Sequence, residues 1–248
     1  MTAVTGEPNA GVAVVVSVIH GFAGTAGASP STVDRDGNRH LVDAAARAGA
    51  DVVLVSVVGA RADSPMELFR MKYAAELHLR STEVPSTVVR SAAFLELWVE
   101  LMQGTARRSG RPLVFGRGDN PINFVSVTDV AAAVERAVVD PQTRGRTLEV
   151  VGPHDLTFNQ LALAVQRAAG RTAPPRHVPP AALRLMAQTV GRVKPELGRQ
   201  ARAALAMDRL DLSAERLAPS DRGAVSADDV LAQEVPPGQQ QQHRAVPH

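Results

Sequence analysis

The sequence predicts an α/β fold built on a doubly wound parallel sheet. Apolar runs of strand length at 12–19, 51–58 and 87–90 alternate with helical patterns at 33–48 and 64–80. Strands that are apolar at nearly every position are typical of parallel sheets covered on both faces. Because such crossovers are right-handed, this β-α-β-α-β order predicts parallel strands with helices packed on the sheet.

Local signals support both of these helices. The first follows capping residues at 31–34 and is expected to end at Gly49. The second is expected to open with Ser64 as its cap, Pro65 at the first helical position and Glu67 as the capping-box partner. Both signals agree with the strand assignments that flank them.

The later elements are shorter, and their patterns place the domain boundary. Helices are expected at 94–105, 179–190 and 195–207. Another helix is expected to begin at the cap Thr128, and one more to run from a capping box of Thr157 and Gln160 to Gly170. Strands are expected at 113–115, 122–127 and 148–151. From Ser213 the periodicity is lost, which predicts a disordered tail over 213–248. The expected domain therefore spans 1–212, with a smaller α/β substrate-side region from about 110.

Composition restricts the function classes. Of 248 residues, 45% are hydrophobic, 25 are acidic and 27 are basic, and there is no cysteine. Disulfides and thiolate metal sites are therefore excluded. His20, which follows the first strand, has neither a carboxylate nor a second histidine at ligand spacing, so no metal site is expected there. The sequence has neither an apolar run of membrane-spanning length nor a signal peptide, which predicts a cytoplasmic protein without a membrane partner. Aromatic residues at 3% weigh against nucleic-acid binding by stacking.

Three glycines after the first strand, Gly21, Gly24 and Gly27, raise the question of a phosphate-binding turn. In a dinucleotide-binding turn the third glycine lies in the first turn of a helix. Here five residues separate Gly27 from the helix expected from Val33, and the next strand lacks the acidic residue that binds ribose at its end. The spacing alone permits either interpretation, and these two absences favour a loop.

The segments at 33–60, 64–98 and 122–137 resemble, in order and spacing, the later strands of atypical and extended short-chain dehydrogenase/reductases, most closely the NmrA-like NAD(P)-binding group. The resemblance runs from about Val12 to Arg171. It implies a Rossmann-like fold in which the run at 12–19 is the family's fourth strand. The first three strands, with the glycine-rich turn, would then lie upstream of Met1, leaving the sheet N-terminally incomplete.

The resemblance also implies roles for individual residues. Lys72 matches the lysine that binds the nicotinamide ribose, and Ser56 matches a serine that binds the substrate carbonyl, so both are candidate catalytic residues. Residues expected to contact the cofactor, NAD or NADP, are Ile19, His20, Gly21, Ser56, Lys72, Ser91, Ala93 and Phe94. Leu68 stands where the family has its proton-donating tyrosine, and Tyr73 is expected to be a packing residue. Two simpler interpretations stay open: Lys72 as a surface partner of Glu76, and Ser56 as an ordinary strand-end serine.

The implied function is that of an NAD(P)-dependent oxidoreductase acting on a small carbonyl or quinone-like substrate. Because the tyrosine is replaced by Leu68, a non-catalytic NAD(P)-sensing or protein-interaction member of the same fold is a second hypothesis. A truncated, inactive form is a third. An exposed sheet edge would favour a homo-oligomer.

Overall fold

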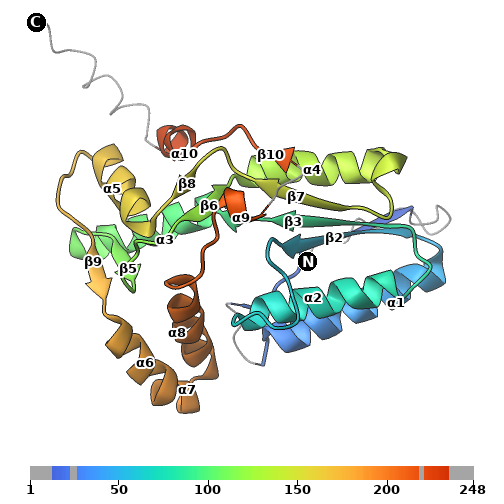
Figure 1. The fold of residues 1–248 in the computed structure, drawn as a ribbon, viewed down its shortest axis with the longest axis horizontal. Helices are drawn as coiled ribbons and strands as arrows, with labels where there is room; N and C mark the ends of the chain where they lie inside the picture. Colours follow the sequence, from blue (N-terminus) through green and yellow to red (C-terminus); the bar gives the residue numbers. More distant parts are fainter. Residues whose placement is uncertain (1–12, 23–26, 218–220, 235–248) are drawn as a thin grey trace, which may run out of the picture.

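The computed structural model describes residues 13–22, 27–217 and 221–234. Its main sheet consists of five parallel strands in the order β1-β2-β3-β7-β10 (Figure 1). These strands span Val14–Ser17, Asp51–Val57, Ser86–Ser91, Thr147–Val151 and Asp221–Arg222. The predicted parallel sheet is confirmed, and its first strand is shorter than expected.

Helices cover both faces of the sheet (Figure 1). On one face α1 (Asn38–Ala48) and α2 (Glu67–Arg80) pack against Leu54 of β2, and on the other α4 (Val127–Val139) packs against Val53. Successive side chains of a strand point to opposite faces, so a sheet covered on both faces needs apolar residues throughout. The doubly wound architecture therefore follows from the apolar runs.

The helix predicted from Val33 begins earlier than expected. A π-helical segment, η1 (Pro30–Gly37), runs directly into α1. Ser29 caps η1: its hydroxyl accepts a hydrogen bond from the backbone N–H of Thr32, and the Thr32 hydroxyl bonds the Ser29 backbone in return. Pro30 at the first position has its φ angle preset for a helix, which explains the start.

β1 lies at one end of the main sheet. Among the described residues its hydrogen-bonded neighbour is β2 alone. Gly27 has φ 89° and precedes the cap of η1 by two residues, so it lies outside the helical first turn. The prediction of a loop at these glycines is therefore confirmed at Gly27, while Gly24 lies outside the described residues.

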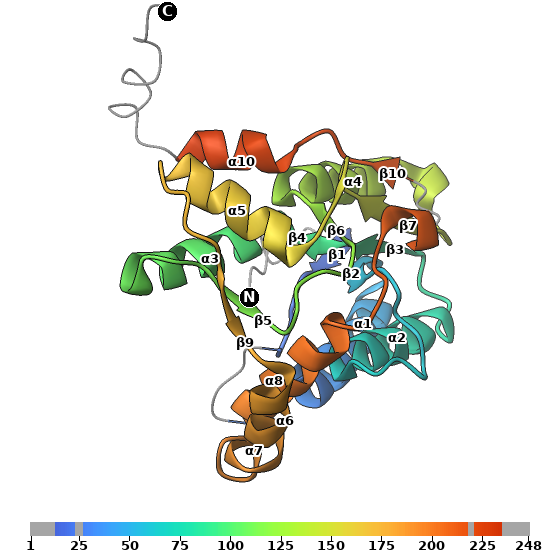
Figure 2. The same ribbon diagram turned by 60° about the vertical axis from the view of Figure 1, so that its left-hand side comes forward.

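The rest of the chain builds a second region beside the main sheet. Its strands are β4 (Ala93–Phe94), β6 (Ile122–Val125) and β8 (Asp155–Leu156) in one small sheet, and β5 (Leu113–Phe115) paired with β9 (Arg176–Val178). Its helices are α3 (Leu95–Ser109), α5 (Phe158–Ala168), α6 (Pro180–Gln188), α7 (Val190–Val193), α8 (Pro195–Met207), α9 (Ala214–Leu217) and α10 (Ala227–Glu234), whereas the short η2 (Pro141–Thr143) joins α4 to β7 beside the main sheet. Figure 2 shows α5 beside α10, and α6, α7 and α8 projecting together at the bottom.

The disordered tail predicted from Ser213 is wrong for the described residues after that point. β10 extends the main sheet by pairing with β7, and α10 buries Val230 and Leu231 in the core around α3 and α5. The Asp129 carboxylate of α4 accepts hydrogen bonds from the backbone of Ala224 and Val225, which fixes the connection. Elements this short have little periodicity of their own and depend on such long-range contacts.

Two predicted helix caps are also corrected. α2 begins at Glu67 after Met66, and the Ser64 hydroxyl accepts a hydrogen bond only from the Met66 backbone at 3.3 Å, so no capping box forms there. The cap of α4 is Ser126, whose hydroxyl accepts from the backbone of Thr128.

In the described residues no helix combines the length and the apolar character that crossing a membrane requires.

The capping box at the start of α5 is confirmed and gives a stability prediction. The Thr157 hydroxyl accepts from the Gln160 backbone at 3.0 Å, and the Gln160 side chain accepts from the Thr157 backbone at 2.7 Å. We expect Thr157→Ala to lower the free energy of unfolding by about 1 kcal/mol, because it removes this cap. Urea denaturation measures the change. Thr128→Ala is the matched control and should change stability by less than about 0.5 kcal/mol, so equal effects of the two substitutions would contradict the assignment.

Candidate functional site

The predicted site residues lie mostly where three strands of the main sheet end. The carboxyl ends of β1, β2 and β3 lie side by side, with Ser17 beside Leu54 and Val57 beside Ser91 in the strand registers. This edge is where open α/β sheets bind ligands. α2 follows β2 and passes beneath the same strand ends, so its inward side chains reach them.

Lys72 reaches this edge from α2 and is buried, with 4% of its surface exposed. Its ammonium donates hydrogen bonds to the carbonyl oxygens of Ile19 (2.8 Å) and Val55 (3.1 Å). The same nitrogen lies 3.2 Å from Oδ1 of Asp34, forming a buried ion pair. Two of the three ammonium protons are therefore donated to these carbonyl oxygens, whereas the contact with Oδ1 of Asp34 is an ion pair in which that oxygen has no hydrogen-bond partner.

Asp34 is the charged partner that holds the lysine. Its side chain is fully buried on η1, and its Oδ2 accepts a hydrogen bond from the Gly21 backbone at 2.8 Å. Burial lowers the pKa of the Lys72 ammonium below its ordinary value, and attraction from Asp34 opposes that shift. The pair therefore ties the segment after β1 to α2.

Ser56 turns toward α2 and joins a second buried network. Its hydroxyl donates to Oε1 of Glu76 at 2.6 Å, and both residues are buried. Arg90 of β3 donates from Nε and Nη2 to the two oxygens of Glu76 (3.0 and 2.7 Å) and from Nη1 to Glu149 (2.9 Å), while Arg80 reaches Glu76 at 3.0 Å. Burial acts to lower the pKa of Arg90, but hydrogen bonds and attraction from the two glutamates outweigh it and raise that pKa.

The other predicted contacts divide into two groups. After β1, His20 is exposed and Gly21 is buried. At the end of β3, the Ser91 hydroxyl lies 3.4 Å from the carbonyl oxygen of Ser56 in β2. Ala93 and Phe94 instead form β4, which pairs with β6 in the small sheet. The structure therefore brings Ile19, Gly21, Ser56, Lys72 and Ser91 to one edge and places Ala93 and Phe94 beside it.

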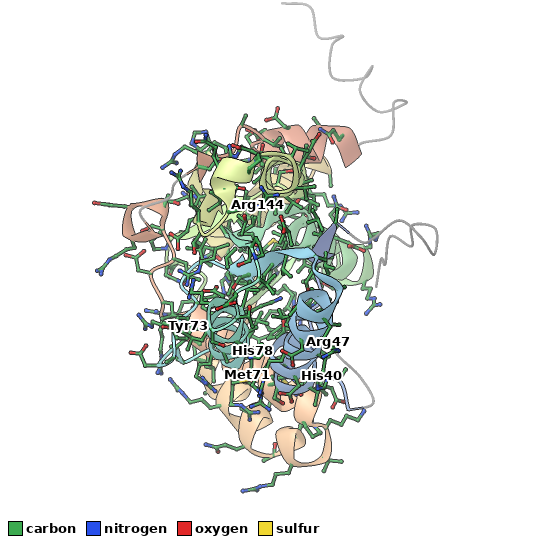
Figure 3. All side chains as sticks on the ribbon, turned by 90° about the vertical axis from the view of Figure 1, so that its right-hand side faces the viewer. His40, Arg47, Met71, Tyr73, His78 and Arg144 are labelled. Carbon is green, nitrogen blue, oxygen red and sulfur yellow. The ribbon has the colours of Figure 1, made fainter. Side chains whose placement is uncertain are left out.

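Leu68 and Tyr73 take no part in a proton-transfer arrangement with Lys72. Leu68 is half-buried and apolar. Figure 3 labels Tyr73 and His78 of α2 and His40 of α1 on the outer face of this helix pair, where His78 bonds Asp43 at 2.7 Å. The Lys72 pairing with Glu76 considered from the sequence is corrected, because the ion pair of Lys72 is with Asp34 and the lysine is not at the surface.

Sequence reasoning missed the role of Asp34, although a signal was present. Counting back in steps of four from the buried Val42 gives Asn38, Asp34 and Pro30, and all of them are buried. Polar residues on the buried stripe of a helix need partners inside the protein. Asn38 accepts from the Ser17 hydroxyl and donates to the Asp34 carbonyl, so the whole stripe is tied to β1 and η1.

A separate pocket of about 370 Å³ lies in the second region, between α5, α10 and the start of α3. Its lining includes the apolar Leu95 and Phe124 and the polar His154, Arg167 and Asp228. None of the predicted catalytic or cofactor residues lines it. The strand-end site and this pocket are therefore different places on the molecule.

A doubly wound parallel sheet with these polar groups at its carboxyl edge defines a Rossmann-like protein. The NmrA-like family model matches residues 10–202, so the chain belongs to the NmrA-like family. A curated relative, an NAD(P)H azoreductase from Xenophilus azovorans, is 27% identical over 139 residues, which cover 56% of this chain and 47% of the relative. The chain spans about half the length of the curated relatives it matches.

Solved structures share the fold at low sequence identity. An NADPH-dependent quinone oxidoreductase from Escherichia coli has a TM-score of 0.68 at 18% identity, covering 91% of this chain and 76% of that one. A triphenylmethane reductase from Citrobacter sp. has a TM-score of 0.68 at 18% identity, covering 91% and 78%. These likenesses confirm the Rossmann-like fold.

Proposed function

We propose that this chain is an NAD(P)-dependent oxidoreductase-like protein of the atypical short-chain dehydrogenase type, acting on a small carbonyl or quinone-like substrate. The observation that carries the proposal is the convergence of Ile19, Ser56, Lys72 and Ser91 on the carboxyl ends of β1 to β3. Family membership supports it. So do the similar proteins, which include an azoreductase and a quinone oxidoreductase.

The strand ends and Lys72 differ in how well they suit a dinucleotide. Val18 is 56% exposed and His20 is exposed, so the carboxyl end of β1 is open to a ligand. Lys72 does not fit the expected contact with a ribose, because its ammonium is directed to Ile19, Val55 and Asp34. In this conformation Lys72 therefore contacts the protein itself and not a cofactor.

A second candidate function is NAD(P) binding without turnover. Two observations favour it. Leu68, one turn before Lys72 on α2, cannot donate a proton, and Lys72 itself is held by Asp34. Both candidates predict nucleotide binding at the same edge. They differ in whether the bound nucleotide is consumed when a quinone, an azo dye or a small aldehyde is added.

Thermal denaturation with NADH or NADPH tests both candidates. At a hundredfold the dissociation constant a ligand adds about 2.7 kcal/mol, which for a chain of this size raises the melting temperature by roughly 5 to 10 °C. Oxidation of the nucleotide with a quinone, dye or aldehyde would support the enzyme, and binding without oxidation would support the sensor. No shift with either nucleotide would contradict both.

Two exposed valines provide a matched pair for placing the site. Val18 lies at the end of β1 and is 56% exposed, and Val193 lies on α7 and is 83% exposed. Val18→Asp should reduce the nucleotide-induced shift, since its carboxylate repels phosphate, whereas Val193→Asp should leave the shift unchanged. Equal shifts in both variants would count against binding at the strand ends.

A further inference from the structure

Four segments of the chain meet at the ion pair between Asp34 and Lys72. Ile19 after β1 and Val55 in β2 accept hydrogen bonds from the ammonium, and Gly21 donates its backbone N–H to Asp34. η1 supplies the carboxylate and α2 the ammonium. One ion pair therefore holds the loop after β1, η1, β2 and α2 together.

The backbone at Gly21 is tightly packed beside this pair. A Cβ at Gly21 would lie 2.4 Å from the Ser29 carbonyl oxygen, so the loop backbone lies directly against the start of η1. The Lys72 and Asp34 side chains are 6% and 0% exposed. The ammonium is enclosed by Ile19, Val55 and Asp34, so a ligand at the strand ends can bind it only by displacing one of these three oxygens.

We propose that Asp34 is a counter-ion latch that withholds the Lys72 ammonium from the carboxyl edge of the sheet. Asp34 is thus a positioning residue: it acts through Lys72 and need not touch a substrate or cofactor itself. The inference deepens the proposed function, on which its ligand-binding consequence rests. Release of the latch makes the ammonium available to a nucleotide ribose.

Among the described residues the other carboxylate that attracts the ammonium is Glu76, which is not free to replace Asp34 as the close partner. Glu76 lies one turn further along α2 and attracts the ammonium weakly, but its two oxygens already accept from Ser56, Arg80 and Arg90. Removing the Asp34 charge therefore leaves burial as the dominant influence, which lowers the pKa of Lys72 further. The amine then becomes both less tightly held and more often neutral.

The rate of amine acetylation measures the latch directly, without any nucleotide. The chain has two lysines, Lys72 and Lys194, and Lys194 is exposed, so it serves as an internal reference in the same molecule. In the wild type we expect Lys72 to react far more slowly than Lys194. Asp34→Asn removes the ion-pair contact of the ammonium and the attraction that opposes the lowering of its pKa, so this variant should speed Lys72 acetylation severalfold relative to Lys194.

Asp36→Asn is the matched control for this labelling experiment. Asp36 also lies on η1 but pairs with Arg35 near the surface, so this variant should leave the Lys72 rate unchanged. Circular dichroism checks folding, and Asp34→Ser replaces Asp34→Asn if the latter does not fold. An unchanged Lys72 rate in a folded Asp34 variant would overturn the latch, as would a wild-type Lys72 that reacts as fast as Lys194.

Nucleotide titration of the same variants separates the latch from the proposed function. If the latch competes with a ribose, Asp34→Asn should bind NADPH about fivefold or more tightly, and adding Lys72→Met should abolish the gain. Weaker or equal binding by Asp34→Asn would overturn competition for the ammonium. Absence of binding in every variant would contradict the proposed function, while the acetylation rates still decide whether Asp34 holds Lys72.

Discussion

Lys72→Met is expected to lower the free energy of unfolding by about 3 to 5 kcal/mol, the loss typical when one partner of a buried ion pair is removed. The substitution leaves the fully buried carboxylate of Asp34 with the Gly21 N–H as its hydrogen-bond partner and removes its counter-ion. It also leaves the carbonyl oxygens of Ile19 and Val55 without the donor they now share. Urea denaturation followed by circular dichroism gives the change directly.

A double substitution distinguishes the charge effect from lost packing. Asp34→Asn combined with Lys72→Met removes both charges, so it should recover at least about 1 kcal/mol relative to the sum of the two single losses. Lys194→Met is the control at an exposed site and should cost less than about 0.5 kcal/mol. A loss below about 1 kcal/mol for Lys72→Met would mean that the ion pair does not stabilise the fold.

Glu76→Ala is expected to cost about 3 kcal/mol of unfolding free energy, because it leaves a partly buried arginine charge without its closest partner. Glu76 is fully buried and accepts hydrogen bonds from Ser56, Arg80 and Arg90, while the Arg90 side chain is 16% exposed and keeps only Glu149 as an acidic partner. The truncation also leaves the Ser56 hydroxyl without its acceptor. Guanidinium denaturation measures the loss.

The control for this second prediction is Glu100→Ala on the exposed side of α3, which should change stability by less than about 0.5 kcal/mol. Comparable losses in the two variants would contradict the assigned network. The result also bears on Ser56, whose catalytic role stays a prediction. The Ser56 hydroxyl donates its hydrogen bond to Glu76 in this structure. If Ser56 has a structural role, Ser56→Ala should therefore lower the free energy of unfolding as well.

The regular part of the fold could be predicted because its information is local. β2 is apolar at nearly every position and is followed by a helix with a single buried stripe, so both its type and its place in a parallel sheet follow from the pattern. The box of Thr157 and Gln160 was predictable for the same reason, since both partners lie in one helical turn. The prediction at Ser64 failed because α2 begins three residues later.

The contacts of the candidate site were harder to predict because they join distant segments. Lys72 was identified through a family resemblance, yet its partner Asp34 lies 38 positions earlier on η1. The four-residue stripe marks Asp34 as buried, but no local pattern says that its partner is Lys72. The network of Glu76 with Arg90 likewise joins α2 to β3. The same reason applies to β10, a two-residue strand whose assignment depends entirely on pairing with β7.

The central claim is that the carboxyl ends of β1, β2 and β3 form a nucleotide site. Titration of the ¹⁵N-labelled protein with NADPH, followed by amide chemical shifts, tests this claim residue by residue. We predict that the largest shifts occur at 18–21, 57–60 and 91–94. Shifts confined to the pocket beside α5 and α10, around Phe124 and Leu156, or no shifts at all, would contradict it.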